Sequence, residues 1–418
     1  MRLVEMEFDI FFSISQTPDS SGYKPSEREM FSNFLEQAVK ADELGFGVGW
    51  IAQAHLSTEV QKTNSRPVVP HYPGEVGLCT DFFQIASMVL SRTSNMEVGS
   101  AVMSILASGG PIAQAERVGS LIALHGLKKE ERRRVHIGFS AGRFEFMARP
   151  YGISPRNALE EVAWPALRGQ IFAEASEIFL RLLSGEVIDS SMIRETVLSR
   201  SNFRSDGDWD NVQKAAMKLL GMSSMPDSIS IPRRYDFESI ATIPKEWRRD
   251  LLNLVIGSHD PALQIEVNKW RPVQVFNLSI TPPDVIEETH KRMSANYHKD
   301  GGEWRRSMMP RTVMVFVNDE PGLTDEQKSI MAKRESKSSI STYWSALEGT
   351  IDPGKVEKAV NNAVIGNPEE VAIQLKQRYH PDDRIMCWFD FFNHDSKRVM
   401  RDMEAFMTKV VPIVNRVV

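Results

Sequence analysis

The sequence predicts an α/β protein whose 418 residues form a (β/α)8 TIM barrel with insertions at its rim. Eight short apolar segments alternate with helical segments at a spacing of about thirty residues, the size of a strand-helix-strand unit. The chain has no phosphate-binding loop and no dinucleotide fingerprint, so a doubly wound nucleotide-binding sheet is the less favoured alternative. The GFGVG segment at 45–49 precedes a strand, whereas the fingerprint must follow one and open a helix.

Residues 25–56 show the repeating unit most clearly. Ser26 precedes an apolar stripe of helical period and has Glu29 three residues later, which is the spacing of a capping box. Gly45 suits the left-handed residue that ends a helix. The following segment, GVGWIA at 47–52, is too apolar for a half-exposed strand and predicts a strand of a parallel sheet covered by helices. Its carboxyl end therefore lies at the edge where parallel barrels place their chemistry.

The other elements follow from the same alternation. Strands are predicted at Glu7–Phe12, 47–52, 96–106, Val135–Ser140, 251–258, 273–279, 312–317 and 385–390. Helices are predicted after Ser26 and at 81–91, 111–124, Ala158–Leu183, 211–220, 284–297, after Asn367, and at 396–414. Asn367 is followed by proline and two acidic residues, a sequence that is typical of a helix start.

Two segments interrupt the alternation and are interpreted as insertions within a single domain spanning 1–418. Residues 57–80 have no regular period, and loops of this length in compact domains are usually functional lids or disordered. Residues 186–249 are rich in Arg, Ser, Asp and Pro around one helical segment, and they lack the apolar content for a core of their own. From the seventh strand to about residue 362, only a polar connection is expected.

Composition limits the classes of function. The net charge of −5 gives no sign of a surface for nucleic acid or anionic membranes, and no run of about eighteen apolar residues could span a bilayer. The two cysteines, Cys79 and Cys387, lie far apart, and the first ten residues are unlike a signal peptide, so a reduced cytoplasmic location is expected. Without a cysteine pair, HExxH or a close His-x-His, no dedicated metal site is expected.

Four segments carry motifs that go beyond a generic barrel. They are AxxADELGF followed by WIAQAHL, MEVGSAV followed by PIAQAERVGSL, RRVHIGFSAGRFEF, and the C-terminal AVIGNPEEVAIQLKQRY with its following helix. Together they resemble the bacterial luciferase-like family of flavin-dependent monooxygenases over most of the chain. The resemblance implies a (β/α)8 barrel, commonly dimeric, that binds reduced FMN or a related deazaflavin at the carboxyl ends of its strands.

The resemblance also implies where a flavin phosphate would bind. VIGSHDPALQ is similar to the family's fifth-strand loop, and Ser258 with the backbone amides of 259–262 is chemically suited to an anion. An ordinary capped helix explains the same residues. Ala141 occupies the position of the family's phosphate-binding arginine, so Arg143 is the candidate replacement, with a rim salt bridge as the alternative. The predicted cofactor-binding residues are Ser100, Ala101, Val102, Ser140, Arg143, Gly257, Ser258 and His259.

In luciferases a non-prolyl cis peptide lies against the flavin ring after the third strand. The bond between Ala101 and Val102 is the equivalent one in this sequence. Small apolar side chains at this position also suit ordinary barrel packing, so both interpretations stay open.

His55 is the main catalytic candidate, with Gln53 beside it. An imidazole at the carboxyl end of a strand can move a proton near neutral pH, although a histidine satisfied within the core is the alternative. The family usually has Glu-His-His where this chain has Gln53, Ala54 and His55, so alanine replaces the family's general-base histidine. Three further polar residues follow the eighth predicted strand at the same edge: Asp390, Asn393 and His394.

The predicted function is that of an oxidoreductase. The specific prediction is a monooxygenase that uses reduced FMN (FMNH2) from a separate flavin reductase, together with O2, to oxygenate a small organic substrate. The rim insertions predict a substrate larger than a simple aldehyde. The alternatives are a deazaflavin-dependent oxidoreductase on the same barrel, a catalytically lapsed flavin-binding protein, and a metal-dependent barrel hydrolase, which the absence of His-x-His disfavours.

Overall fold

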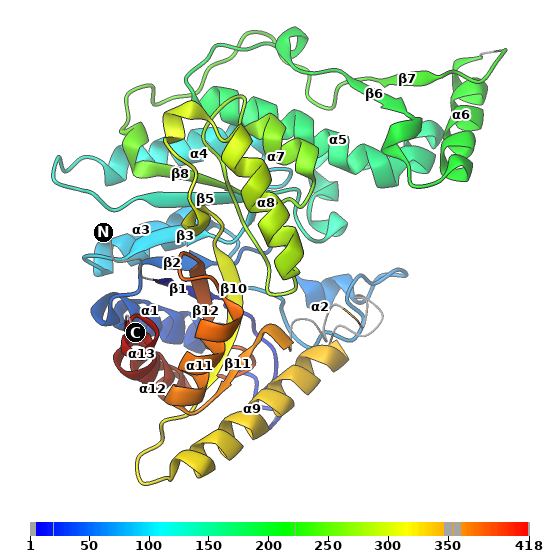
Figure 1. Cartoon of the computed structure of the whole chain (residues 1–418). Coiled ribbons are helices and arrows are strands. Elements are labelled where there is room, and N and C mark those ends of the chain that lie inside the picture. Colours follow the sequence, from blue (N-terminus) through cyan, green and yellow to red (C-terminus); the bar gives the residue numbers. More distant parts are fainter. Residues whose placement is uncertain (1–5, 20, 222, 347–353, 355–360, 417–418) are drawn as a thin grey trace.

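The computed structural model describes residues 6–19, 21–221, 223–346, 354 and 361–416 (Figure 1). Its main sheet consists of parallel strands: β1 (Glu7–Phe12), β2 (Val48–Ile51), β3 (Glu97–Ser100), β4 (Met103–Ser104), β5 (Val135–Ser140), β8 (Leu252–Ile256), β9 (Gln274–Val275), β10 (Arg311–Val317), β11 (Val364–Gly366) and β12 (Arg384–Trp388). Strands were thus correctly predicted at all eight positions, although several are shorter than expected.

The sheet curls into a barrel. Its strands follow the order β11, β10, β12, β1, β2, β3, β5, β8 and β9. Beyond β9, Asn277 forms a parallel bridge with Arg311 at the start of β10. The Asn277 amide donates to the Pro310 carbonyl at 2.9 Å, and the Thr312 amide donates to the Asn277 carbonyl at 3.2 Å. The two sides of the sheet therefore meet, and the predicted barrel class is confirmed.

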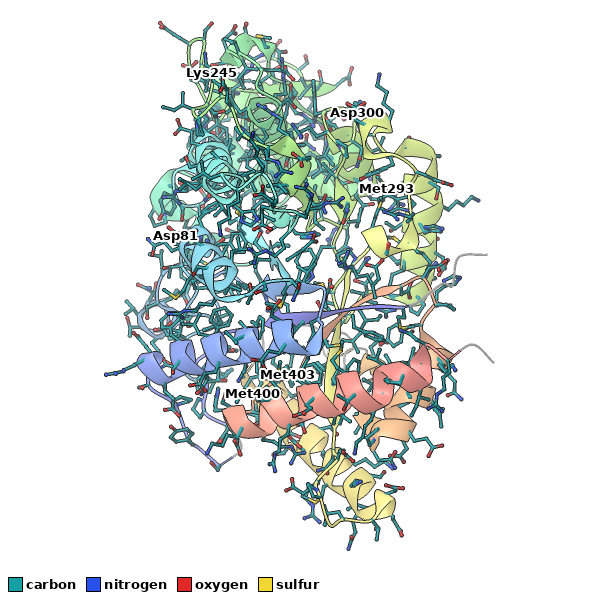
Figure 2. All side chains as sticks on the ribbon, turned by 90° about the vertical axis from the view of Figure 1, so that its left-hand side faces the viewer. Asp81, Lys245, Met293, Asp300, Met400 and Met403 are labelled. Carbon is teal, nitrogen blue, oxygen red and sulfur yellow. The ribbon has the colours of Figure 1, made fainter. Side chains whose placement is uncertain are left out.

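Helices cover the outside of the sheet, as a parallel sheet buried on both faces requires. They are α1 (Glu27–Leu44), α2 (Thr58–Gln61), α3 (Phe82–Arg92), α4 (Gly110–His125), α5 (Ala158–Leu183), α6 (Asp206–Leu220), α7 (Pro261–Val267), α8 (Pro283–Asn296), α9 (Asp325–Ala346), α11 (Pro368–Arg378), α12 (Ser396–Ala405) and α13 (Val411–Val414). Figure 2 shows α1 and α12 running side by side, and the labelled Met403 of α12 is fully buried.

The caps of α1 explain where this helix begins and ends. The Ser26 side chain accepts a hydrogen bond from the Glu29 amide at 3.2 Å, and Gly45 has the expected left-handed conformation, with φ of 85°. The Glu29 carboxylate accepts instead from the Tyr23 hydroxyl at 2.6 Å. Only the serine half of the predicted capping box is therefore formed.

Residues 186–249 hold more regular structure than the sequence indicated. A two-stranded antiparallel ribbon, β6 (Thr196–Ser199) with β7 (Ser228–Ile231), lies beside α6. Figure 1 shows these elements projecting from the barrel. Leu198, Trp209 and Ile229 nevertheless belong to the same hydrophobic cluster as the barrel core.

The polar connection predicted between the seventh strand and residue 362 contains a long helix that was not predicted. Helix α9 occupies 22 of these residues. Its buried positions are small and mostly polar, so no apolar stripe marks the helix in the sequence: Ser329, Ala332, Ser336, Ser339 and Ala346. The short strand β11, which also escaped prediction, then pairs with the carboxyl half of β10.

An ion pair between Asp9 and Arg384 occupies the amino-terminal end of the barrel interior. Arg384 Nε lies 2.7 Å from Asp9 Oδ2, and Asp9 is fully buried. Asp9 also accepts from the Val48 amide at 3.0 Å and from Trp50 Nε1 at 2.7 Å. One carboxylate thus connects β1, β2 and β12.

We predict that Asp9→Ala lowers the free energy of unfolding by about 3–5 kcal/mol, because Arg384 keeps only the half-exposed Glu7 as a partner and the buried Val48 amide and Trp50 indole lose their acceptor. Chemical denaturation followed by circular dichroism measures the loss. The control is Asp250→Ala, which breaks an exposed ion pair with Arg248 and should cost less than about 1 kcal/mol. Equal losses in the two variants would contradict a structural role for the buried pair.

Candidate functional site

The carboxyl ends of the strands form the mouth of the barrel. Below it, the interior is filled by large buried side chains: Phe11, Val48, Trp50, Val255, Phe276 and Met386. The partly buried side chains that pack on this layer are mostly small: Ala52, Ala101, Val102 and Trp388. The surface of this layer at the mouth is therefore mainly apolar.

The third predicted strand, 96–106, is divided by a cis peptide bond. The bond joins Ala101 to Val102 and separates β3 from β4, at the position that the family resemblance identified. The Ala101 amide donates to the Ile51 carbonyl at 2.8 Å, and the Ser100 hydroxyl donates to the Gly138 carbonyl at 2.9 Å. Both neighbouring strands thus hold this segment in place.

Five of the predicted cofactor residues come together around Val102. A Cβ atom on Gly257 would lie 2.9 Å from Val102 Cγ2 and 3.4 Å from Ser140 Cβ. A Cβ atom on Gly138 would lie only 2.1 Å from the Ser100 carbonyl oxygen. Glycine is therefore required where β3, β5 and β8 approach one another most closely.

The loop after β8 differs from the phosphate-binding arrangement that the sequence suggested. Asp260 caps α7, and its Oδ1 accepts from the Ala262 amide at 2.9 Å and the Leu263 amide at 3.4 Å. The Ser258 hydroxyl accepts from the Asp260 amide at 3.2 Å, and His259 is exposed. The Asp260 carboxylate thus already occupies amides that had been assigned to an anion.

Arg143 lies at the rim after β5. Its side chain is exposed, and its guanidinium carbon lies 5.1 Å from the centre of the Phe144 ring. No ion pair of Arg143 is found within the described ranges, so the rim salt bridge considered from the sequence does not form there. The contact that the structure shows for the guanidinium is therefore the one with the Phe144 ring.

His55 is buried and faces the turn before α4. The Ser108 hydroxyl lies 3.2 Å from His55 Nδ1 and 3.4 Å from Nε2. Burial and the charge of Arg117 hold the pKa of His55 below its ordinary value, against the opposing effect of Asp81. The ring is therefore neutral at pH 7, which suits a general base. The sequence reading missed Ser108, although the SGGP segment that begins there is typical of a tight turn.

Gln53 faces away from His55. Its Nε2 donates to the Thr80 carbonyl at 3.1 Å, while its buried Oε1 has no hydrogen-bond partner among the residues that the structure describes. The Gln53 amide therefore does not bond to His55 in this structure. Ala54 packs instead against the loop that follows β2.

Three connections meet above the mouth and form a small apolar cluster. It comprises Ala54, Val69, Tyr72, Phe144, Met147 and Ala346, drawn from the 57–80 segment, the loop after β5 and the end of α9. The Tyr72 and Ser15 hydroxyls lie 2.6 Å apart. Figure 1 shows α2 and the end of α9 on the same side of the molecule. These segments can therefore shield the mouth from water.

Of the polar residues after β12, only Asp390 remains incompletely bonded. The Ser13 hydroxyl donates to Asp390 Oδ2 at 3.2 Å, whereas Oδ1 has no partner in the described part of the chain. Burial raises the pKa of Asp390 to about 6, although hydrogen bonds with Ser13 and with the Trp388 indole lower it. Asn393 donates to Glu335 Oε1 at 3.2 Å, and His394 bonds to the Thr17 carbonyl at the outer rim.

Residues 6–193 match the family model described as luciferase-like monooxygenase. This part of the chain is therefore similar to that family. No match was found among curated proteins. None of the described helices has both the length and the apolar character needed to cross a membrane.

Solved structures of luciferase-like enzymes share the fold along nearly the whole chain. Monooxygenase RslO1 from Streptomyces bottropensis has a TM-score of 0.63 at 15% identity, with coverage of 97% of this chain and 99% of that one. The oxygenating constituent of 3,6-diketocamphane monooxygenase from Pseudomonas putida, in complex with FMN, has a TM-score of 0.56 at 14% sequence identity, and the match covers 98% of each chain. An F420-dependent secondary alcohol dehydrogenase has a TM-score of 0.55 at 13% sequence identity. The match covers 98% of this chain and 99% of that one.

We predict that Gly138→Ala lowers the free energy of unfolding by about 1–3 kcal/mol, because the new methyl group collides with the Ser100 carbonyl oxygen. Thermal and urea unfolding would measure the change. The matched control is Gly169→Ala within α5, where a Cβ meets open space and should stabilise the helix by roughly 0.5–1 kcal/mol. A neutral Gly138→Ala variant would show that β3 and β5 do not pack this closely.

Proposed function

We propose that this protein is a flavin-dependent monooxygenase that acts as a dimer and uses reduced FMN from a separate reductase, with O2, on an organic substrate. The observation that carries the proposal is the convergence of Val102, Ser140 and Gly257 beside the small apolar floor of the mouth. This arrangement fits a flat ring system. The unpartnered Gln53 Oε1 adds a polar atom with which such a ring can bond.

In this proposal, different residues of the mouth contact different parts of the cofactor. Ala101 and Val102 would support the ring from below, and Gln53 would bond to its polar edge. Arg143 would pair with the phosphate, because a guanidinium offers a planar set of donors. When bound, the flavin supplies the redox chemistry with O2, and the protein supplies position and shelter from water.

His55 is the proton-handling residue in this proposal. Its neutral ring accepts a proton, and Ser108 fixes the ring at the edge of the mouth. Because Ala54 replaces the usual histidine, His55 has no second imidazole beside it.

A deazaflavin-dependent oxidoreductase is the second candidate. The fold it shares with an F420-dependent dehydrogenase supports this alternative, since both cofactors offer a similar ring to the same barrel mouth. The two candidates differ in whether O2 takes part in the reaction.

Anaerobic titration tests the proposal directly. We expect photoreduced FMN to bind with one site per chain, and subsequent mixing with air-saturated buffer to reoxidise the bound flavin more slowly than free FMN. Stopped-flow absorbance records both rates. Binding of reduced F420 without binding of FMN would favour the second candidate, and binding of neither cofactor would overturn both.

We predict that Arg143→Ala weakens FMN binding by roughly tenfold, the cost of one charge-assisted hydrogen bond, while riboflavin binding is unchanged because it has no phosphate. Fluorescence titration measures both ligands. Arg149→Ala removes an exposed arginine from the same connection and should leave both affinities unchanged. An equal loss for FMN and riboflavin would show that Arg143 does not recognise the phosphate.

A further inference from the structure

The seam that closes the barrel holds two buried polar side chains on the outer face of the sheet. Asn277 and Arg311 are directly opposite each other in a parallel bridge, so their side chains project from the same face. Phe276, the neighbour of Asn277, belongs to the interior layer. Because successive residues of a strand face opposite sides, Asn277 and Arg311 face outward, away from the apolar floor of the mouth.

Each of these side chains has a buried N–H group without a hydrogen-bond partner. Asn277 is 1% exposed and Arg311 is 5% exposed, yet Asn277 Nδ2 and Arg311 Nε have no acceptor within the ranges that the structure describes. The Arg311 guanidinium does donate from Nη2 to the Thr281 carbonyl at 3.2 Å. Buried polar groups are nearly always hydrogen-bonded, so two unpartnered donors on one face indicate an acceptor that this chain does not supply.

The charge of Arg311 also has no carboxylate of its own. Asp383 acts on Arg311 through its charge, but its two oxygens already accept from Arg306 Nε at 2.6 Å and from the His380 amide at 3.1 Å. No carboxylate in the described part of the chain forms an ion pair with Arg311. Burial and the charge of Arg306 lower the pKa of Arg311, although an arginine keeps its proton in proteins. A buried positive charge is therefore left without a partner, which is costly.

The neighbouring Tyr379 does not supply the missing negative charge. The guanidinium carbon of Arg311 lies 5.1 Å from the centre of the Tyr379 ring, and the face of such a ring attracts a cation. Burial raises the pKa of Tyr379 to about 12, so its hydroxyl is neutral at pH 7. That hydroxyl donates to the Asn362 carbonyl at 2.8 Å. The ring thus stabilises the guanidinium without neutralising it.

Two donors and an unpaired positive charge are complementary to a small anion. A water molecule accepts hydrogen bonds, but its own two hydrogens then need acceptors. The unpartnered side-chain atoms of this pair, Asn277 Nδ2 and Arg311 Nε, are both donors. A halide ion only accepts, and its charge is opposite to that of the guanidinium. It therefore meets both requirements at once.

We propose that Asn277 and Arg311 bind a small monovalent anion of the chloride type on the outer face of the barrel seam, with Asn277 Nδ2 and Arg311 Nε as its donors. The two sides of the sheet meet here through the Asn277 bridge and its backbone hydrogen bonds to Pro310 and Thr312. The anion therefore stabilises the closed barrel. Its site is separate from the mouth, so this inference does not depend on the proposed function.

Thermal unfolding of the full chain in potassium chloride and in potassium gluconate, at equal ionic strength, tests the proposal. A ligand that binds only the folded state raises the melting temperature as its concentration rises above Kd. We expect chloride and bromide to raise the melting temperature of the wild type by a few degrees relative to gluconate, which is too large for a buried site. Arg311→Met should remove this difference between the salts. Equal melting temperatures of the wild type in all three salts would overturn the inference.

Asn277→Asp distinguishes an anion site from an amide with a purely structural role. Its carboxylate supplies both the acceptor and the charge opposite Arg311, so this variant should melt in gluconate at the temperature of the wild type in chloride, and chloride should raise it no further. Asn268→Asp is the matched control, because Asn268 Nδ2 already donates to the Gln264 and Val273 carbonyls at 3.0 Å each. The control should melt at a lower temperature and keep the difference between the salts. An Asn277→Asp variant that melts below the wild type in both salts would contradict the proposal.

Crystals grown in sodium bromide locate the ion directly. We expect a peak of anomalous scattering within hydrogen-bonding distance of Asn277 Nδ2 and Arg311 Nε in the wild type, and no such peak in Asn277→Asp. A water molecule at this position, without anomalous signal, would overturn the inference and leave the proposed function untouched.

Discussion

The buried ion pair between Asp9 and Arg384 is the interaction on which the geometry of the barrel depends. A charge inside a protein must be paired and hydrogen-bonded, so the positions of its partners are strongly constrained. Asp9 lies on β1 and has partners on β2 and β12, and this fixes the relative register of the three strands. A shift by one residue would turn these groups away from one another. The same register sets where the strands end, and hence where the mouth lies.

The interior changes character from the amino-terminal end to the mouth. The first layer is polar: beside the ion pair, His136 Nε2 lies 2.6 Å from Glu97. Burial opposes ionisation of Glu97, but the hydrogen bond with His136 and the charge of Arg384 hold the pKa of Glu97 below its ordinary value. Large side chains such as Trp50 fill the next layer, and small side chains such as Ala101 pack on that layer at the mouth. Rigid packing below thus supports an open, adaptable surface above.

The sequence could predict the barrel because its strands are short apolar runs that repeat with their helices. Helix α9 escaped prediction because serine and alanine fill its buried positions, so packing against the barrel leaves no apolar period. Of the residues predicted to bind a cofactor, Ser100, Val102, Ser140 and Gly257 lie close together, because parallel strands end at one edge. The partners of His55 and Asp260 depend on side-chain directions in loops, which a pattern of residue types does not encode.

The composition of the mouth bears on how chemistry there proceeds. Alanine at position 54 removes one imidazole, and His55 is turned toward Ser108 with its pKa lowered by burial and by Arg117. Among the described residues, the floor itself is formed mainly by apolar packing. A site with few proton-transfer groups gains most from holding its ligands in a fixed orientation and from excluding water.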